Sequence, residues 1–160
     1  MKALLSLVAA TAALVATPAT GQTAEASPLI GSWSVDVSRL PNPPAERPKQ
    51  VTITFAESGT NRWRTQVEII DPAGQTHRAT SSYTLDGTAA AVEGGVEADV
   101  TGVKLAAPNV LVMLLGLRGV PVSTRVYTAA ADGRSMTETA TYMGSDGKPV
   151  LRTAHFTRVP

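Results

Sequence analysis

The chain of 160 residues contains no cysteine, so no disulfide bond can hold its fold together. If such a chain is exported, packing alone must stabilise its domain, which suits a bacterial periplasm better than a eukaryotic extracellular space. The chain also has no block of like charge: 14 Lys and Arg stand against 13 Asp and Glu, a formal net charge of +1. Because nucleic acid binding depends on clustered positive charge, we expect no nucleic acid partner.

The sequence also lacks motifs for catalysis and metal binding. The two histidines, His77 and His155, are far apart, and neither stands in a ligand spacing with another His or a carboxylate. A Ser-His-Asp triad would have no Gly-x-Ser-x-Gly elbow to support it. Gly94-Gly95 lacks the strand–helix context of a phosphate loop. We therefore predict no metal, no cofactor and no catalytic residue, and a binding protein rather than an enzyme.

Residues 1–26 have the pattern of a secretory signal peptide. A short positive start precedes an apolar run over residues 4–16, which is too short to span a bilayer, and Ala24-Glu25-Ala26 fits a cleavage site, as does Ala19-Thr20-Gly21. A retained membrane anchor is the alternative, whereas a lipoprotein anchor is excluded because no cysteine follows. We expect one domain over residues 27–160, without a transmembrane segment, in the periplasm or secreted from a bacterium.

Alternation of apolar and polar residues recurs along the mature chain, whereas the period of a helix is not seen. The last third, residues 121–160, has three runs rich in Thr, Val and aromatic residues. Asp132-Gly133 and Asp146-Gly147 separate these runs. Asp-Gly favours the positive φ of tight hairpin turns, so this region predicts a three-stranded antiparallel meander.

The same alternation predicts further strands upstream. They are expected over residues 29–37, 51–55, 63–69, 75–85, 96–105 and 110–117. A bulge is expected near Gly102. The pattern of residues 88–95 is weakly determined, and the Pro-rich stretch 38–48 is expected to be a connector. About nine or ten short strands with frequent turns indicate a barrel or a sandwich. We predict an all-β fold, an antiparallel up-and-down β-barrel of about 8–10 strands, because closure removes exposed edges.

Gly31-Ser32-Trp33 opens the first predicted strand and resembles the Gly-x-Trp signature of lipocalins and their calycin relatives. In those barrels the Trp packs at the closed end beneath a basic residue from a late strand. The resemblance implies this closing role for Gly31 and Trp33, with Arg158 or Arg152 as the basic residue.

The chain from Ile30 to Val159 also resembles a group of small exported bacterial proteins with a lipocalin-like barrel. Besides the Gly31 motif, the resemblance rests on Tyr83-x-x-Asp86-Gly87, Thr124-Arg125-Val126, Asp132-Gly133-Arg134-Ser135-Met136-Thr137 and Asp146-Gly147-Lys148-Pro149. That group has no settled activity, so the resemblance implies a fold rather than a function. This chain departs from the group at residues 110–117, where relatives tend to alternate with charged residues.

Residues 110–117, VLVMLLGL, are apolar at seven of eight positions, so both faces of this strand are hydrophobic. One interpretation is a strand covered on the outside by a loop or by the connector. The others are a ligand cavity inside the barrel, lined by Met113 and Leu115, or a dimer interface outside it.

Arg125 and Tyr127 share one face of a strand, and an arginine can bind a carboxylate through two hydrogen bonds. The pair is similar to the Arg-x-Tyr pair that holds a fatty-acid carboxylate in intracellular lipid-binding barrels, although that pair lies on the last strand and at least two strands follow here. The alternative is a surface arginine beside a packed tyrosine. Glu138 and Arg152 would form either a charged pair inside the barrel or, the arrangement we favour, an ordinary cross-strand pair outside it.

Two hypotheses follow. In the first, the chain is a lipocalin-like binding protein that holds a small hydrophobic or amphipathic ligand in its barrel. In the second, side chains fill the barrel, and the apolar strand 110–117 mediates self-association as a homodimer or binds another partner. An enzyme that uses the cavity for isomerase or hydrolase chemistry is a third.

Overall fold

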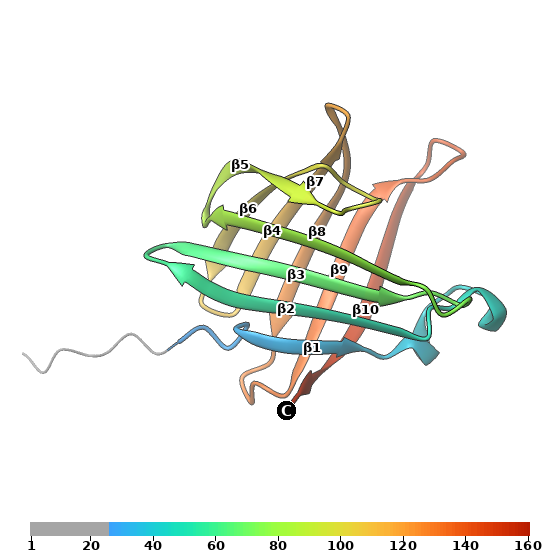
Figure 1. Ribbon diagram of the computed structural model, residues 1–160, viewed down its shortest axis with the longest axis horizontal. Helices are drawn as coiled ribbons and strands as arrows, with labels where there is room; N and C mark the ends of the chain where they lie inside the picture. Colours follow the sequence, from blue (N-terminus) through green and yellow to red (C-terminus); the bar gives the residue numbers. More distant parts are fainter. Residues whose placement is uncertain (1–25) are drawn as a thin grey trace, which may run out of the picture.

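Ten antiparallel strands close into one barrel in the computed structural model, which describes residues 26–160 (Figure 1). The predicted signal peptide, residues 1–26, lies outside the described residues except for Ala26. The strands are β1 Gly31–Val35, β2 Gln50–Gly59, β3 Arg62–Ile70, β4 Thr76–Thr84, β5 Asp86–Glu93, β6 Val100–Ala107, β7 Val110–Leu117, β8 Val120–Ala129, β9 Ser135–Met143 and β10 Pro149–Val159. The Pro-rich connector between β1 and β2 holds two short 3-10 turns, η1 Val37–Arg39 and η2 Pro44–Glu46.

Each strand pairs with its neighbours in sequence, and β1 pairs with β10 to close the ring. The prediction of an all-β, antiparallel up-and-down barrel is confirmed, and a two-sheet sandwich is excluded. The ten strands stand at the upper end of the predicted number. Because the ring is closed, every described strand has a partner on both sides, which leaves no continuous free edge within residues 26–160.

Strand β5 is the main departure from the sequence pattern. The weakly determined segment 88–95 forms most of this strand, which starts at Asp86. The sequence predicts a bulge near Gly102, on β6. That placement is wrong, because the extra residue lies on the neighbouring strand β5, between Asp86 and Ala89. Gly102 faces that irregularity: a Cβ at this position would lie 2.9 Å from the carbonyl oxygen of Gly87. The close approach of the Gly87 backbone therefore explains why position 102 is a glycine, and no bulge at Gly102 is needed.

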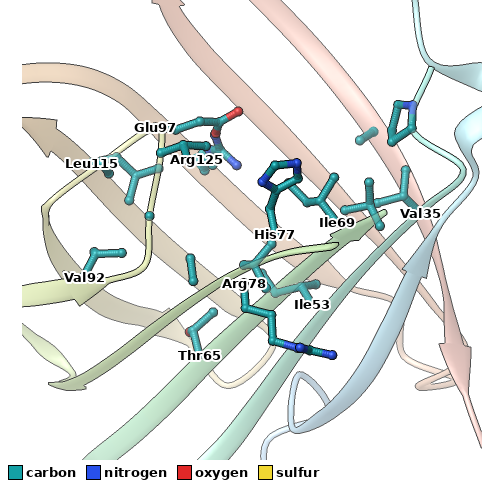
Figure 2. Close-up of a pocket in the computed structure, with 18 of the residues that line it drawn as sticks. Val35, Ile53, Thr65, Ile69, His77, Arg78, Val92, Glu97, Leu115 and Arg125 are labelled. Atoms are coloured by element: carbon teal, nitrogen blue, oxygen red, sulfur yellow. The ribbon is translucent and has the colours of Figure 1, made fainter. Parts of the chain in front are cut away.

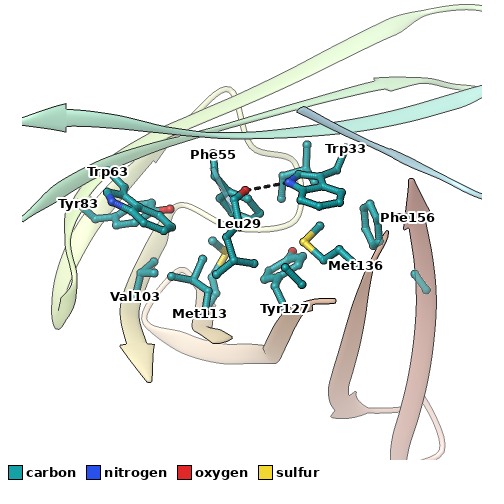
Figure 3. Packing of buried hydrophobic residues seen from close by; sticks show 14 of the residues in the cluster. Leu29, Trp33, Phe55, Trp63, Tyr83, Val103, Met113, Tyr127, Met136 and Phe156 are labelled. Carbon is teal, nitrogen blue, oxygen red and sulfur yellow. Dashed lines mark hydrogen bonds between the residues drawn. The ribbon is translucent and has the colours of Figure 1, made fainter. Parts of the chain in front are cut away.

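Side chains fill one end of the barrel, the closed end, where the chain turns after β2, β4, β6 and β8 (Figure 3). The indole N–H of Trp33 donates a hydrogen bond of 2.8 Å to the carbonyl of Leu29. Edge-on contacts join Phe55 to Tyr127 and Tyr127 to Phe156, with ring centroids 5.3 and 6.4 Å apart. Other buried members of this core are Trp63, Tyr83, Val103, Leu111 and Met136.

The opposite end, the open end, carries the connector 36–49 and the turns that follow β3, β5, β7 and β9. The sheet is most loosely joined between β4 and β5, which share only two residue pairs, Thr80 with Glu93 and Ser81 with Val92. The segment 94–99 then leads from β5 into β6. The barrel therefore has one end packed with side chains and one end bounded by loops.

Candidate ligand-binding cavity

A cavity of about 360 Å³ occupies the barrel between the closed-end core and the open end (Figure 2). One wall comes from strands β2 to β4, and it combines aliphatic residues with the polar residues Thr65, His77, Arg78, Thr80 and Ser81. The residues of this wall include Val51, Ile53, Val67, Ile69 and Ala79. The wall on the other side comes from β7, β8 and β10, and its residues are Met113, Leu115, Arg125, Tyr127, Arg152 and Ala154. The cavity thus has one wall that carries many of its aliphatic side chains and one wall that carries Arg125 and Arg152.

The charged wall is ordered by the register of four neighbouring strands. Met113 on β7 pairs with Arg125 on β8, Arg125 pairs with Ala140 on β9, and Ala140 pairs with Arg152 on β10. These four residues therefore form one row across the sheet, which we call the arginine row. Because side chains alternate between the two faces of a strand, all four point into the barrel.

A second row lies one step nearer the closed end. There Leu111 pairs with Tyr127, Tyr127 with Glu138, and Glu138 with Ala154. Burial raises the pKa of the Tyr127 phenol well above its ordinary value, and the neighbouring Glu138 carboxylate raises it further. The phenol is therefore neutral at any physiological pH and keeps a proton to donate.

Arg125 stands at the centre of the charged groups. Its Nη2 donates a 2.6 Å hydrogen bond to Oε2 of Glu97, and its Nη1 lies 3.8 Å from Oε2 of Glu138. Burial lowers the pKa of Arg125, but Tyr127, Glu138 and Glu97 raise it by more, so the net shift is upward. The guanidinium remains a cation inside the barrel, and its Nε is buried with no hydrogen-bond partner among residues 26–160.

Arg152 shares this environment but not these partners. It lies on the same strand face as the buried Ala154 and Phe156, and it lines the cavity. Its Nε is buried with no hydrogen-bond acceptor, and it makes no ion pair in the described part of the chain. Arg152 therefore places a guanidinium at the cavity wall, and the N–H at its Nε has no acceptor in the described part of the protein.

Two predictions about these residues need correction. The favoured outward placement of Glu138 and Arg152 is wrong: Glu138 is only 5 % exposed, and Arg152 lines the cavity. Glu138 interacts with Arg125 rather than with Arg152, because Glu138 is directly opposite Ala154 in the register. The alternative of a surface Arg125 is also wrong, since its side chain is 21 % exposed and faces the cavity.

The apolar strand β7 divides cleanly between its two faces. Leu111, Met113 and Leu115 are buried and point inward, and the last two line the cavity. Val112 is half-buried on the outer face, and Leu114 beside it is 46 % exposed. The strand therefore supplies both a cavity wall and a small apolar strip on the outside.

The residues expected to close the barrel lie at the other end. The Arg158 guanidinium stacks over the Trp33 ring, with its Cζ 4.2 Å from the ring centroid. A Cβ on Gly31 would overlap Nη1 of Arg158, so only glycine fits beneath this stack. Of the two arginines considered for this position, Arg158 occupies it, and Arg152 lies in the cavity wall instead.

Several groups at the mouth were not predicted from the sequence. Glu97 reaches Arg125 from the segment between β5 and β6, and Figure 2 shows it on the side of the cavity away from Val35 and Ile69. His77 lies 3.0 Å from Asp71, and its hydrogen bond lowers the pKa of that carboxyl. The acidic residue after Gly94-Gly95 is visible in the sequence, but nothing there places it against β8.

Within residues 26–160, no group of three or more His, Cys, Asp or Glu side chains is placed to hold a metal ion. Over the same range, no helix combines the length and apolar character needed to cross a membrane. The sequence matches no protein-family model and no curated protein. The cavity and its two unlike walls are therefore the features of the molecule that bear on its function.

Proposed function

We propose that the chain is a lipocalin-like binding protein that holds a small amphipathic molecule in the open half of its barrel. The observation that carries this proposal is the cavity of about 360 Å³ in which a wall with many aliphatic side chains faces the arginine row. Pockets for small molecules measure roughly 300 to 1,000 Å³ and combine apolar lining with a few polar groups. This cavity lies at the lower end of that range, which favours a compact ligand.

The proposal includes export. The leader-like residues 1–26 and the cysteine-free chain support a periplasmic or secreted protein, released by cleavage near Ala26. Mass measurement of the protein recovered from a bacterial periplasm tests this directly. A mature protein that begins near Ser27 is the expected result, and an intact leader in the recovered protein would contradict it.

Native mass spectrometry of the same detergent-free protein tests ligand binding. We expect an adduct of small mass that is lost on denaturation and extracts into organic solvent. Met113→Lys places a charge on the cavity wall and should abolish the adduct, because Met113 is buried and faces inward. Leu151→Lys is the matched control, since Leu151 is 75 % exposed. A bare wild-type mass that no added lipophile shifts would refute the proposed function.

The outer strip of β7 supports a second candidate, an interaction protein. Val112 and Leu114 lie on that face, and Leu114 is exposed. The strip is small, so we rank this candidate below ligand binding.

A further inference from the structure

We propose that the ligand is a lipophilic acid, with one anionic head group held between Arg125 and Arg152 above Ala140. This inference rests on the proposed function, because it names the chemistry of the molecule that the cavity holds. It assigns Arg152, which has no ion-pair partner within residues 26–160, to the head group.

The arginine row provides the geometry. Arg125 and Arg152 flank Ala140 on the strands to either side of it, so their Cα atoms are separated by two strand spacings, ~10 Å. The residue between them contributes only a methyl group, which leaves the two long side chains free to converge. A carboxylate has two oxygens and about four acceptor sites, so it can accept hydrogen bonds from both guanidinium groups.

One donor of each arginine in this row has no acceptor in the protein, although Nη2 of Arg125 is bonded to Glu97. The Nε atoms of both arginines are buried without an acceptor among the described residues. A guanidinium does not lose its proton in a protein, so these donors cannot be removed by a change of charge state. Buried donors without partners are costly, and an anion in the cavity would supply the acceptors. A cationic head group would instead be repelled by Arg152, which has no carboxylate partner within residues 26–160.

Glu97 shows that a carboxylate fits against this row. Its Oε2 accepts a 2.6 Å hydrogen bond from Arg125, although the Glu97 side chain is 63 % exposed and comes from the segment after β5. Water screens an ion pair whose carboxylate is largely exposed, so such a pair contributes little to stability. The ligand's carboxylate can therefore replace Glu97 at Arg125 at small cost, and Glu97 acts as an internal competitor for the site.

The wall opposite the arginine row defines the rest of the ligand. Val51, Ile53, Val67 and Ile69 face the arginine row from the opposite side of the barrel, so the body of the ligand would lie against aliphatic side chains. The cavity has about the volume of a dozen water molecules at ~30 Å³ each. Decanoic acid, with its ten carbons and two oxygens, is a probe of suitable size, and decan-1-ol is the neutral molecule of matched length.

Calorimetric titration of the lipid-stripped exported protein with these two probes tests the inference. At pH 7.5 the wild type should bind decanoic acid at least tenfold more tightly than decan-1-ol. Arg152→Met should weaken acid binding at least tenfold and leave alcohol binding within twofold. Arg64→Met, which removes the same charge from an exposed position on β3, should change neither. Thermal unfolding establishes that each variant is folded.

Glu97→Gln provides an independent arm that leaves the barrel core untouched. It should tighten acid binding severalfold and leave alcohol binding unchanged, because it removes the competing carboxylate. The inference that the ligand is a lipophilic acid would be overturned if the wild type bound acid and alcohol equally, or if Arg152→Met weakened both equally. Either result would leave the proposed binding function intact. If neither probe binds and native mass spectrometry finds no adduct, both the inference and the proposed function fail.

Discussion

The guanidinium of Arg158, on the last strand, lies over the indole of Trp33, on the first, with its Cζ 4.2 Å from the ring centroid. The same guanidinium donates hydrogen bonds to the backbone carbonyls of Pro28, Ile30 and Gly133. One side chain therefore joins the segment before β1, the turn between β8 and β9, and β10.

Arg158→Met should lower the free energy of unfolding by roughly 3 kcal/mol or more, because it removes a cation–π contact and three charge-assisted hydrogen bonds. Arg158→Lys should lose most of the same energy, since one ammonium cannot reproduce the planar stack and the fork of donors. Urea unfolding measures both. Arg134→Met, an exposed arginine at the same end, is the control and should stay within about 0.5 kcal/mol of wild type. Equal effects of the two methionine variants would refute this role.

Gly31→Ala should destabilise the barrel by more than about 1 kcal/mol, for two separable reasons. Gly31 has a φ of +133°, where an L-residue is strained, and its new Cβ would overlap the Arg158 guanidinium. A double-mutant cycle with Arg158→Met separates these causes by urea unfolding. The cost of Gly31→Ala should be smaller in the Arg158→Met background; an unchanged cost would leave backbone strain as the whole effect.

Tyr83 makes the barrel sensitive to alkaline pH. Burial raises the pKa of its phenol to about 12, with the Thr65 hydrogen bond opposing the shift in part. In the unfolded chain the phenol ionises near pH 10, so between pH 10 and 12 the unfolded state binds fewer protons than the folded state. The free energy of unfolding therefore falls as the pH rises through this window, by roughly 2 to 3 kcal/mol, and this group contributes no slope below it.

Tyr83→Phe tests whether this phenol causes the loss of stability at alkaline pH. The quantity to compare is the slope of the free energy of unfolding against pH, because the variant also loses the hydrogen bond to Thr65 at every pH. The variant should show a shallower loss of stability between pH 10 and 12, measured by urea unfolding across the window. Some loss should persist, since the pKa of Tyr127 is also raised. Identical slopes in wild type and variant would contradict the assignment to Tyr83.

Leu114 and Leu115 separate the two candidate functions. Leu115→Arg should destabilise the barrel by about 3 kcal/mol or more, because it places a charge at a buried, inward position. Leu114→Arg, on the outer face, should change stability by less than about 0.5 kcal/mol. Stable interfaces bury about 800 Å² per partner, far more than this strip offers, so analytical ultracentrifugation should find a monomer in both wild type and Leu114→Arg. A wild-type dimer that Leu114→Arg dissociates would favour the interaction protein instead.

The strands that could be predicted from the sequence are those with one buried and one solvated face. Residues 63–69 alternate clearly because Trp63 and Thr65 face the core while Arg62 and Arg64 face water. Strand β5 gave no such signal, since Asp86–Glu93 is exposed at most of its positions and rich in Ala. A strand held by its neighbours rather than by its own burial leaves no alternation to find.

The candidate site was predictable only in part. Arg125 and Tyr127 were placed on one face by their spacing, and that follows from the two-residue period of any strand. The arginine row needs the register of β8, β9 and β10, which one sequence does not reveal. Glu97 comes from a segment with no regular structure, so its approach to Arg125 depends on the closed barrel itself.

The pairing of β1 with β10 also determines when folding can finish. The hydrogen bond from Arg158 to Ile30 spans 128 residues, so the ring closes only after almost the whole domain is available. Contacts of such long range are slow to form because loop closure costs entropy before they contribute. Until β10 docks, β1 and β9 each present an unpaired edge, and partly synthesised or truncated chains are therefore the species most prone to aggregate.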